Sequence, residues 1–234
     1  MEHKTKTDLG KDVVGIDIFE IIGPIMVGPS SSHTAGAVRI ALAARKLLGC
    51  RPAKAELLLH GSFADTGEGH GTDRALIAGL LGFAPDDERI PDSFRFAQEC
   101  GMEFSFGRVV LRQAHPNSVL LRLWREKDQL PMEIVGASVG GGRIEIREID
   151  GISLRFTAES PTLIVKNRDN PGSVADVSYL ISRRKINIAT FQVSRSSRGG
   201  EAVMVIECDA PVEQELIHNI LSMPDIISVV GINP

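Results

Sequence analysis

The sequence is poor in the residues that nucleic-acid binding requires. Of its 234 residues only 5% are aromatic, and 26 Lys and Arg are outnumbered by 30 Asp and Glu, which gives a net charge of −4. Binding to a nucleic-acid backbone usually depends on a concentrated basic surface, and single strands stack on aromatic side chains. We therefore expect no nucleic-acid partner.

Cysteine is also scarce, and its three copies lie far apart in the sequence, at Cys50, Cys100 and Cys208. Because no C-x-x-C pair occurs, the pattern indicates neither a disulfide framework nor a zinc site. An iron–sulfur cluster needs three or four converging thiolates. We expect no metal site in this chain, and any cluster that the protein uses would belong to another chain.

Long apolar runs are missing as well. No stretch approaches the roughly 20 residues of a membrane span, and the polar segment Met1–Asp12 lacks the charged head and apolar run of a signal peptide. These features predict a cytoplasmic protein without a membrane partner. The length suits two domains, and 43% hydrophobic residues can form cores of ordinary size.

Residues 1–156 predict a mixed α/β domain. A helix is expected over Ala35–Leu48, with Ser32 or Thr34 as its N-cap and Gly49 as its end. A strand (Ala55–Leu59) and a glycine-rich loop (Gly61–Gly71) follow. Further helices are expected at Thr72–Leu81 and Asp92–Cys100. Short β-type runs then predict an antiparallel meander over Met102–Phe106, Val109–Arg112, Ser118–Trp124, Met132–Val139, Arg143–Ile149 and Ile152–Phe156.

Residues 161–234 show a second pattern, after a linker at Thr157–Pro161. The order strand, helix, strand, strand, helix, strand is that of a ferredoxin-like βαββαβ domain. The expected elements are Thr162–Val165, Gly172–Arg183 (opened by Pro171), Asn187–Ser194, Glu201–Glu207, Val212–Ser222 and Ile226–Ile232. The fold class is thus α+β or α/β, in two domains.

The segment Leu163–Ser173 (LIVKNRDNPGS), followed by Ile186-Asn187-Ile188, resembles an ACT domain, most closely that of phosphoglycerate dehydrogenase, which binds serine. In that relative a His stands where this chain has Asn167, and an Asn stands where it has Asp169. The ligand is therefore either an amino acid or, at Asp169, an ammonium group or cation, and simple turn capping is the alternative. The resemblance implies a homo-oligomer formed through ACT domains and an effector site at Asn167, Asp169, Asn170, Gly172 and Asn187.

The motif Gly28–Gly36 (GPSSSHTAG) sets hydroxyls beside the free backbone N–H groups of a helix start. That combination binds an anion such as a carboxylate. His33 is its titratable group and can remove or deliver a proton. Capping alone is the alternative. A Ser-His hydrolase is disfavoured, because adjacent residues rarely face each other and no orienting acid is evident.

A second motif spans His60–Asp73 (HGSFADTGEGHGTD), and its glycines at 67, 69 and 71 permit the close approach of a ligand or partner. The spacing is not G-x-G-x-x-G, so no dinucleotide site is predicted. His60 and His70 are metal ligands on paper only, and an active-site or interface loop is favoured; the plainer alternative is that His60 ends a strand and His70 lies in the loop. Asp65 and Asp73 are expected to orient histidines or to cap the next helix.

Together the two motifs are similar to the β region of the iron–sulfur L-serine dehydratases, here of the two-chain type. The resemblance implies L-serine ammonia-lyase activity, which yields pyruvate and ammonia in serine catabolism and gluconeogenesis. It also implies an α-subunit partner that holds a [4Fe–4S] cluster, and a monovalent cation such as K⁺. We expect His33 and Ser32 to be catalytic, and the substrate to be bound by Ser30, Ser31, Thr34, His60, Asp65 and His70.

A rival interpretation is non-catalytic. Residues 1–156 also resemble the intervening substrate-binding domain of some phosphoglycerate dehydrogenases, where that domain is regulatory. Both motifs would then bind an effector or a partner, and the chain would be a serine-sensing module.

Overall fold

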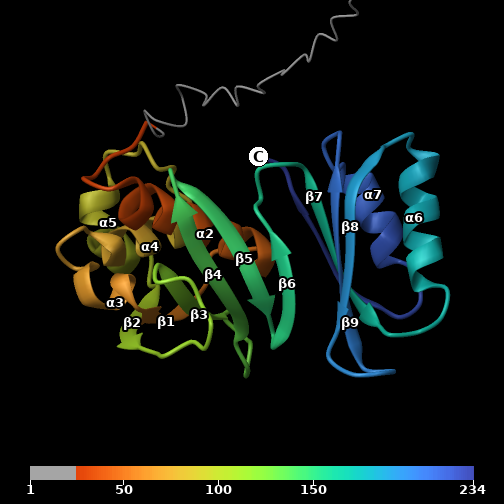
Figure 1. Ribbon diagram of the computed structural model, residues 1–234, viewed down its shortest axis with the longest axis horizontal. Helices are drawn as coiled ribbons and strands as arrows, with labels where there is room; N and C mark the ends of the chain where they lie inside the picture. Colours follow the sequence, from red (N-terminus) through yellow and green to blue (C-terminus); the bar gives the residue numbers. More distant parts are fainter. Residues whose placement is uncertain (1–24) are drawn as a thin grey trace, which may run out of the picture.

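The computed structural model describes residues 25–234, which form two β-sheets packed side by side (Figure 1). The segment Met1–Asp12 lies outside the described residues. The first part contains, in chain order, the π-helical turn η1 (Ser31–Gly36), α2 (Ala37–Leu48), β1 (Lys54–His60), α3 (Ser62–Thr66), α4 (Thr72–Leu81), the 3₁₀ turn η2 (Ile90–Asp92), α5 (Ser93–Glu99), β2 (Glu103–Arg108), β3 (Ser118–Trp124), β4 (Met132–Gly140), β5 (Arg143–Ile149) and β6 (Ile152–Phe156).

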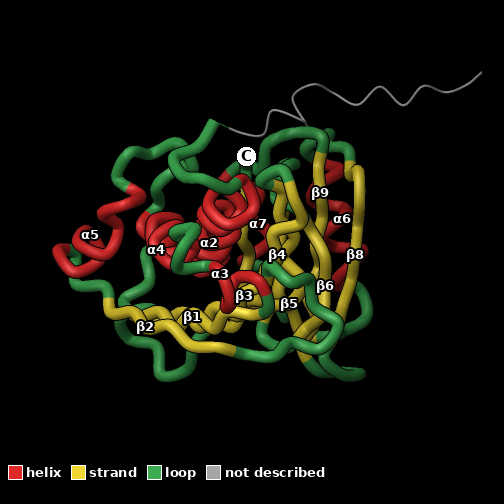
Figure 2. Tube along the Cα trace, turned by 60° about the vertical axis from the view of Figure 1, so that its left-hand side comes forward, coloured by secondary structure: helices red, strands yellow, loops and turns green. Residues whose placement is uncertain are grey.

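The first sheet has the strand order β2-β1-β3-β4-β5-β6, with the helices on one face (Figure 2). The predicted antiparallel meander is confirmed for β3 to β6, but it is wrong for β2, which pairs in parallel with β1. Because the chain forms helices between β1 and β2, it returns in a crossover, as a parallel pair requires.

Side chains of β3 alternate between the two faces of this sheet. Val119, Leu121 and Leu123 are fully buried on the helix-covered face. Arg122 points the other way, where it forms ion pairs of 3.0 Å with Glu56 and 2.7 Å with Glu133 on the neighbouring strands. The period-2 pattern of the sequence therefore fixes which face of β3 meets the helices.

Two predictions about the connections are wrong. The segment Val109–Arg112 is irregular, and the Leu111 N–H donates to Nδ1 of His60 instead of joining a strand ladder. The predicted loop Gly61–Gly71 contains the short helix α3, whose first turn closes with Ala64 and Asp65 N–H groups on the carbonyl of Gly61. The helix ends at Gly49 and Gly82 are confirmed, each with a left-handed backbone.

The second part is the predicted βαββαβ unit, with strand order β10-β7-β9-β8. Its helices lie on the outer face of the sheet, away from the first part (Figure 1). The expected helix Gly172–Arg183, opened by Pro171, is confirmed at its end, but α6 begins at Ser173, because Gly172 adopts a positive φ of 99° and forms its N-cap. The elements are β7 (Thr162–Arg168), α6 (Ser173–Arg183), β8 (Ile188–Arg195), β9 (Glu201–Cys208), α7 (Gln214–Leu221) and β10 (Ile226–Ile232).

The two sheets share an apolar contact. Ile164, Val203, Val205 and Ile232 of the second sheet are buried in the same cluster as the core of the first part, whereas Leu163 packs with α6 and α7. At the edge of this contact Lys166 reaches Asp150 at 3.0 Å and Glu201 at 2.8 Å. The division into domains 1–156 and 161–234 stays a prediction.

Candidate active site

The site begins at the π-helical turn η1, which carries the serine-rich motif. Ser30, not Ser32 or Thr34, is the N-cap: its Oγ accepts from the His33 N–H at 3.1 Å. The wide first turn moves the start of the helix to Ser31, so the predicted cap was wrong. Single π turns occur often at functional sites. Ser31 and Ser32 are half-buried, and the structure gives their hydroxyls no hydrogen-bond partner within residues 25–234.

The His33 ring sits between residues of the second motif. Its Nδ1 lies 3.2 Å from Thr72 Oγ1, and its Nε2 lies 3.2 Å from Ser62 Oγ. Phe63 packs edge-on against the ring with a centroid separation of 5.2 Å, and His70 lies 4.9 Å away. The residue is only 9% exposed. Segments about 30 to 40 residues apart thus build one histidine site.

The electrostatics of this site disfavour a charged imidazole. Burial lowers the pKa of His33 below its ordinary value of 6.5, and the neighbouring His70 lowers it further. Burial disfavours the charged form of a group, and a second potential cation nearby acts in the same direction. His33 is therefore neutral near pH 7, the state that can hold one proton and offer one lone pair.

His70 links the two motifs through its backbone as well as its ring. Its carbonyl accepts from Thr34 Oγ1 at 3.2 Å. Its Nδ1 lies 2.9 Å from the carbonyl oxygen of Thr66. Because a carbonyl only accepts, Nδ1 of His70 carries a proton and donates it. The Nε2 atom of His70 consequently keeps its lone pair in the neutral ring.

Two predicted site residues lie outside this group. Nδ1 of His60 lies 3.3 Å from both the carbonyl oxygen of Val109 and the backbone nitrogen of Leu111, so His60 contacts the segment after β2. Asp65 is exposed and pairs with Arg108 at 3.1 Å, and it therefore orients no histidine. Asp73 accepts from the backbone N–H of Arg74 at 2.8 Å. Neither carboxylate is hydrogen-bonded to a histidine within residues 25–234, and the N-cap of α4 is Gly71, with no side-chain cap.

Sequence reasoning missed Ser62, Thr66 and Thr72 as parts of the site. All three stand in the second motif, so a signal was present, but hydroxyl side chains carry no distinctive spacing. Only the packing of α3 and α4 against η1 brings Ser62 and Thr72 to the two ring nitrogens of His33.

The predicted effector residues are divided between two ends of the ACT sheet. Asn167 pairs with Ala202 in the β7–β9 ladder, whereas Asn187 lies beside Asp209, after the other end of β9. Six strand positions at about 3.3 Å each separate these ends. Within one chain, Asn187 therefore does not join the other four residues.

Asp169 already has partners within the chain. Its Oδ2 accepts from Arg195 at 2.9 Å and from the Gly199 N–H at 3.0 Å. The backbone N–H of Gly199 and the Arg195 guanidinium lower the pKa of the Asp169 carboxyl. Asn170 donates to Asp225 at 2.8 Å. In contrast, Oδ1 of Asn167 is buried without a hydrogen-bond partner among the described residues.

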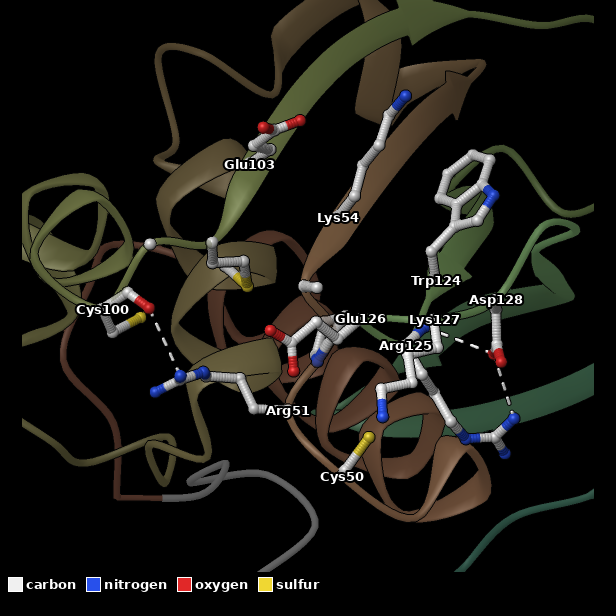
Figure 3. A pocket seen from close by; sticks show the side chains of 14 residues that line it. Cys50, Arg51, Lys54, Cys100, Glu103, Trp124, Arg125, Glu126, Lys127 and Asp128 are labelled. Carbon is white, nitrogen blue, oxygen red and sulfur yellow. Dashed lines mark hydrogen bonds and ion pairs between the residues drawn. The ribbon is translucent and has the colours of Figure 1, made fainter.

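A cavity of about 960 Å³ lies at the end of α2 and β1 remote from His33 (Figure 3). Cys50 and Cys100 line it, Lys54 reaches over the Trp124 ring at 5.0 Å, and Arg51 donates to the Cys100 carbonyl at 3.3 Å. The 12 residues of α2, at about 1.5 Å each, separate it from the histidine site. We therefore locate the candidate site at His33 and not in this cavity.

The described residues offer no metal-binding group. Within residues 25–234 no three His, Cys, Asp or Glu side chains are close enough to hold an ion. Cys50 is exposed, Cys100 is partly buried, and Cys208 is buried in the ACT part. Among the helices in that range, none has the length and hydropathy needed to cross a membrane.

Comparison with known proteins finds similarity over both parts of the chain. The family described as "Serine dehydratase beta chain" matches residues 16–148, and the "AHAS small subunit-like ACT domain" matches residues 163–228. The "Probable L-serine dehydratase, beta chain" of Bacillus subtilis is 40% identical over 92% of this chain and 97% of its own length. The "L-serine dehydratase, beta chain" of Peptoniphilus asaccharolyticus is 39% identical over 88% and 92%. A "D-3-phosphoglycerate dehydrogenase" of Methanocaldococcus jannaschii is 35% identical over 48% of this chain, but over only 21% of its own length.

The fold and the histidine site define a two-part α/β protein with a C-terminal ACT domain. More narrowly, the chain belongs to the serine dehydratase beta chain family. It is therefore one component of a dehydratase enzyme. The predicted family and fold class are thereby confirmed.

Proposed function

We propose that this chain is the β subunit of a two-chain L-serine dehydratase and completes its active site with an α subunit that bears a [4Fe–4S] cluster. The observation that carries the proposal is the convergence of both sequence motifs on the buried, neutral His33. In this reaction L-serine loses its α-proton and its hydroxyl as water, and the resulting enamine hydrolyses to pyruvate and ammonia.

The residues of this chain do not fit the cluster. Of its three cysteines, Cys208 lies in the ACT part, and Cys50 and Cys100 line the cavity remote from His33. A cluster needs three or four converging thiolates. We therefore assign the cluster to the α subunit and derive no step through it. A requirement for K⁺, a cytoplasmic location and a homo-oligomer formed through ACT domains stay predictions.

This chain contributes groups that bind and orient the substrate. The hydroxyls of Ser30 and Thr34 already form hydrogen bonds within the chain: Ser30 Oγ accepts from the His33 N–H, and Thr34 Oγ1 donates to the His70 carbonyl. Ser31 and Ser32 keep their hydroxyls for a ligand, next to N–H groups at a helix start, which suits the carboxylate of serine. His33 follows them directly in the sequence and is the acid–base group proposed for the site.

Pyruvate formation from L-serine tests the proposal under anaerobic conditions. The chain is assayed alone and together with the cluster-bearing partner after iron–sulfur reconstitution. We expect activity only in the mixture. His33→Ala should then lower turnover by roughly 10²- to 10⁴-fold, the usual contribution of a general acid or base, without preventing complex formation. His218→Ala, an exposed histidine on α7, is the matched control. Normal turnover by the His33 variant would remove His33 from the reaction.

A second candidate function is a serine-sensing module. It is favoured by the buried Oδ1 of Asn167, which has no partner within residues 25–234 and lies on the strand that precedes the start of α6. Calorimetry with L-serine tests it directly. Binding by this chain that Asn167→Ala abolishes, with no activity in the mixture, would support the sensor and contradict the dehydratase.

A further inference from the structure

The surroundings of His33 determine which of its ring nitrogens carries the proton. In a neutral imidazole one nitrogen donates and the other accepts. Thr72 Oγ1 lies 3.2 Å from Nδ1, and Ser62 Oγ lies 3.2 Å from Nε2. A hydroxyl can donate or accept, so the tautomer depends on where the hydrogen of each hydroxyl can go.

The hydroxyl hydrogen of Thr72 has a single available acceptor among the described residues. The residue is 0% exposed, and within residues 25–234 Nδ1 of His33 is the only hydrogen-bond partner of its Oγ1. If Nδ1 carried the proton, the Thr72 hydroxyl hydrogen would be buried without an acceptor, which is unfavourable. The hydroxyl therefore donates to Nδ1 and occupies the lone pair of that nitrogen.

Ser62 fits the same assignment from the other side of the ring. Thr66 Oγ1 donates to the Ser62 carbonyl at 3.0 Å, so its oxygen can accept from Ser62 Oγ, 3.4 Å away. Ser62 then gives its hydrogen to Thr66 and accepts one from Nε2 of His33. The hydrogen bonds run in one direction, from Thr72 through His33 and Ser62 to Thr66, and such chains reinforce one another.

We propose that Thr72 is a positioning residue that fixes His33 in the Nε2–H tautomer, so that the ring presents a proton and not a lone pair to Ser62. The consequence of this tautomer for catalysis rests on the proposed function of His33. His33 begins the reaction with a proton at Nε2, and removal of the α-proton of serine falls to another group.

Nitrogen-15 NMR of the full chain tests the tautomer without the partner. The chain has six histidines, and loss of one signal set in His33→Gln assigns His33. We expect a protonated Nε2 and an unprotonated, hydrogen-bonded Nδ1. In Thr72→Val the Nδ1 signal should move toward that of a nitrogen without a hydrogen bond. Thr72→Ser and the remote control Thr190→Val should leave it in place. A protonated Nδ1 in the wild type, or an unmoved Nδ1 signal in Thr72→Val, would overturn the proposal.

Kinetics of the reconstituted complex test the positioning role. Thr72→Val should lower kcat by roughly 10- to 100-fold, part of an acid–base contribution of ~10²–10⁴, with little change in KM. Thr72→Ser should recover most of kcat. An unchanged kcat in Thr72→Val would reject the role in positioning. If the wild-type complex is inactive while the tautomer is as expected, the proposed function fails and the tautomer assignment stands. If Thr72→Val does not fold, the NMR measurement of the His33 tautomer in the wild-type chain tests the proposal by itself.

Discussion

At the scale of single residues, the burial of the His33 ring links its protonation to the stability of the fold. Its ring is enclosed by Phe63, by His70 and by two hydroxyls, and this burial lowers its pKa. The unfolded chain exposes the same imidazole to water, where its pKa returns to about 6.5. Between these two pKa values the unfolded state binds the extra proton, so acid favours unfolding.

This difference predicts a specific pH dependence. The free energy of unfolding should fall as the pH drops below about 6.5 and stop falling, as far as His33 is concerned, below its folded pKa. His33→Gln removes this titration, so the stability of wild type relative to His33→Gln should decrease as the pH falls through about 6.5 toward the lower folded pKa of His33. Urea unfolding curves of both proteins across this range measure it. A constant difference would show that His33 is as easily protonated in the fold as in the unfolded chain.

At the scale of elements, η1 is held against β4 at a position without space for a side chain. A Cβ at Gly36 would lie 2.1 Å from Oγ of Ser138 and 2.7 Å from its Cβ. The Ser138 hydroxyl is itself buried without a partner among the described residues. The close approach of η1 to the sheet therefore depends on glycine at one side and a small residue at the other.

Gly36→Ala should consequently destabilise the protein by about 1–3 kcal/mol, because the new methyl group meets a filled position. Ser138→Gly in the same chain removes the clashing atoms and should restore much of the loss. Gly69→Ala, whose Cβ would have its nearest neighbour at 3.8 Å, is the control and should cost less. Denaturant unfolding of the four proteins measures these differences. Equal losses in the single and double variants would contradict the contact as the cause.

At the scale of the whole molecule, the two sheets share buried apolar surface, so we expect them to unfold together. Val203, 2% exposed, packs into the cluster centred on the first part. Val203→Ala should lower stability by on the order of 2 kcal/mol and lower the melting temperature of both parts. Val193→Ala, at a position 47% exposed on β8, should change stability by less than about 0.5 kcal/mol. Calorimetry distinguishes the outcomes: two separate transitions, with only one shifted, would mean that the parts fold independently.

The sequence predicted regular elements more accurately than connections. Thr72–Leu81 and Ile226–Ile232 match α4 and β10 residue for residue, because terminal glycines mark the helix and a short apolar run marks the strand. Val109–Arg112 has β-type residues, yet its backbone bonds to His60, a partner that no local pattern reveals. The N-cap of η1 was misplaced for a similar reason, since a wide π turn has no recognised sequence signal.

The sequence by itself determined the family and the two-part α/β architecture, since these follow from local motifs and periodicity, and it singled out His33 as a candidate site residue. Only the tertiary structure decided what surrounds that ring. Ser62 and Thr72 lie 29 and 39 residues from His33, and the packing of α3 and α4 against η1 brings them to its two nitrogens. The structure likewise separates Asn187 from Asn167 and engages Asp65 with Arg108. Residue type states what a side chain can do, whereas burial and the available partners decide which of those roles it takes.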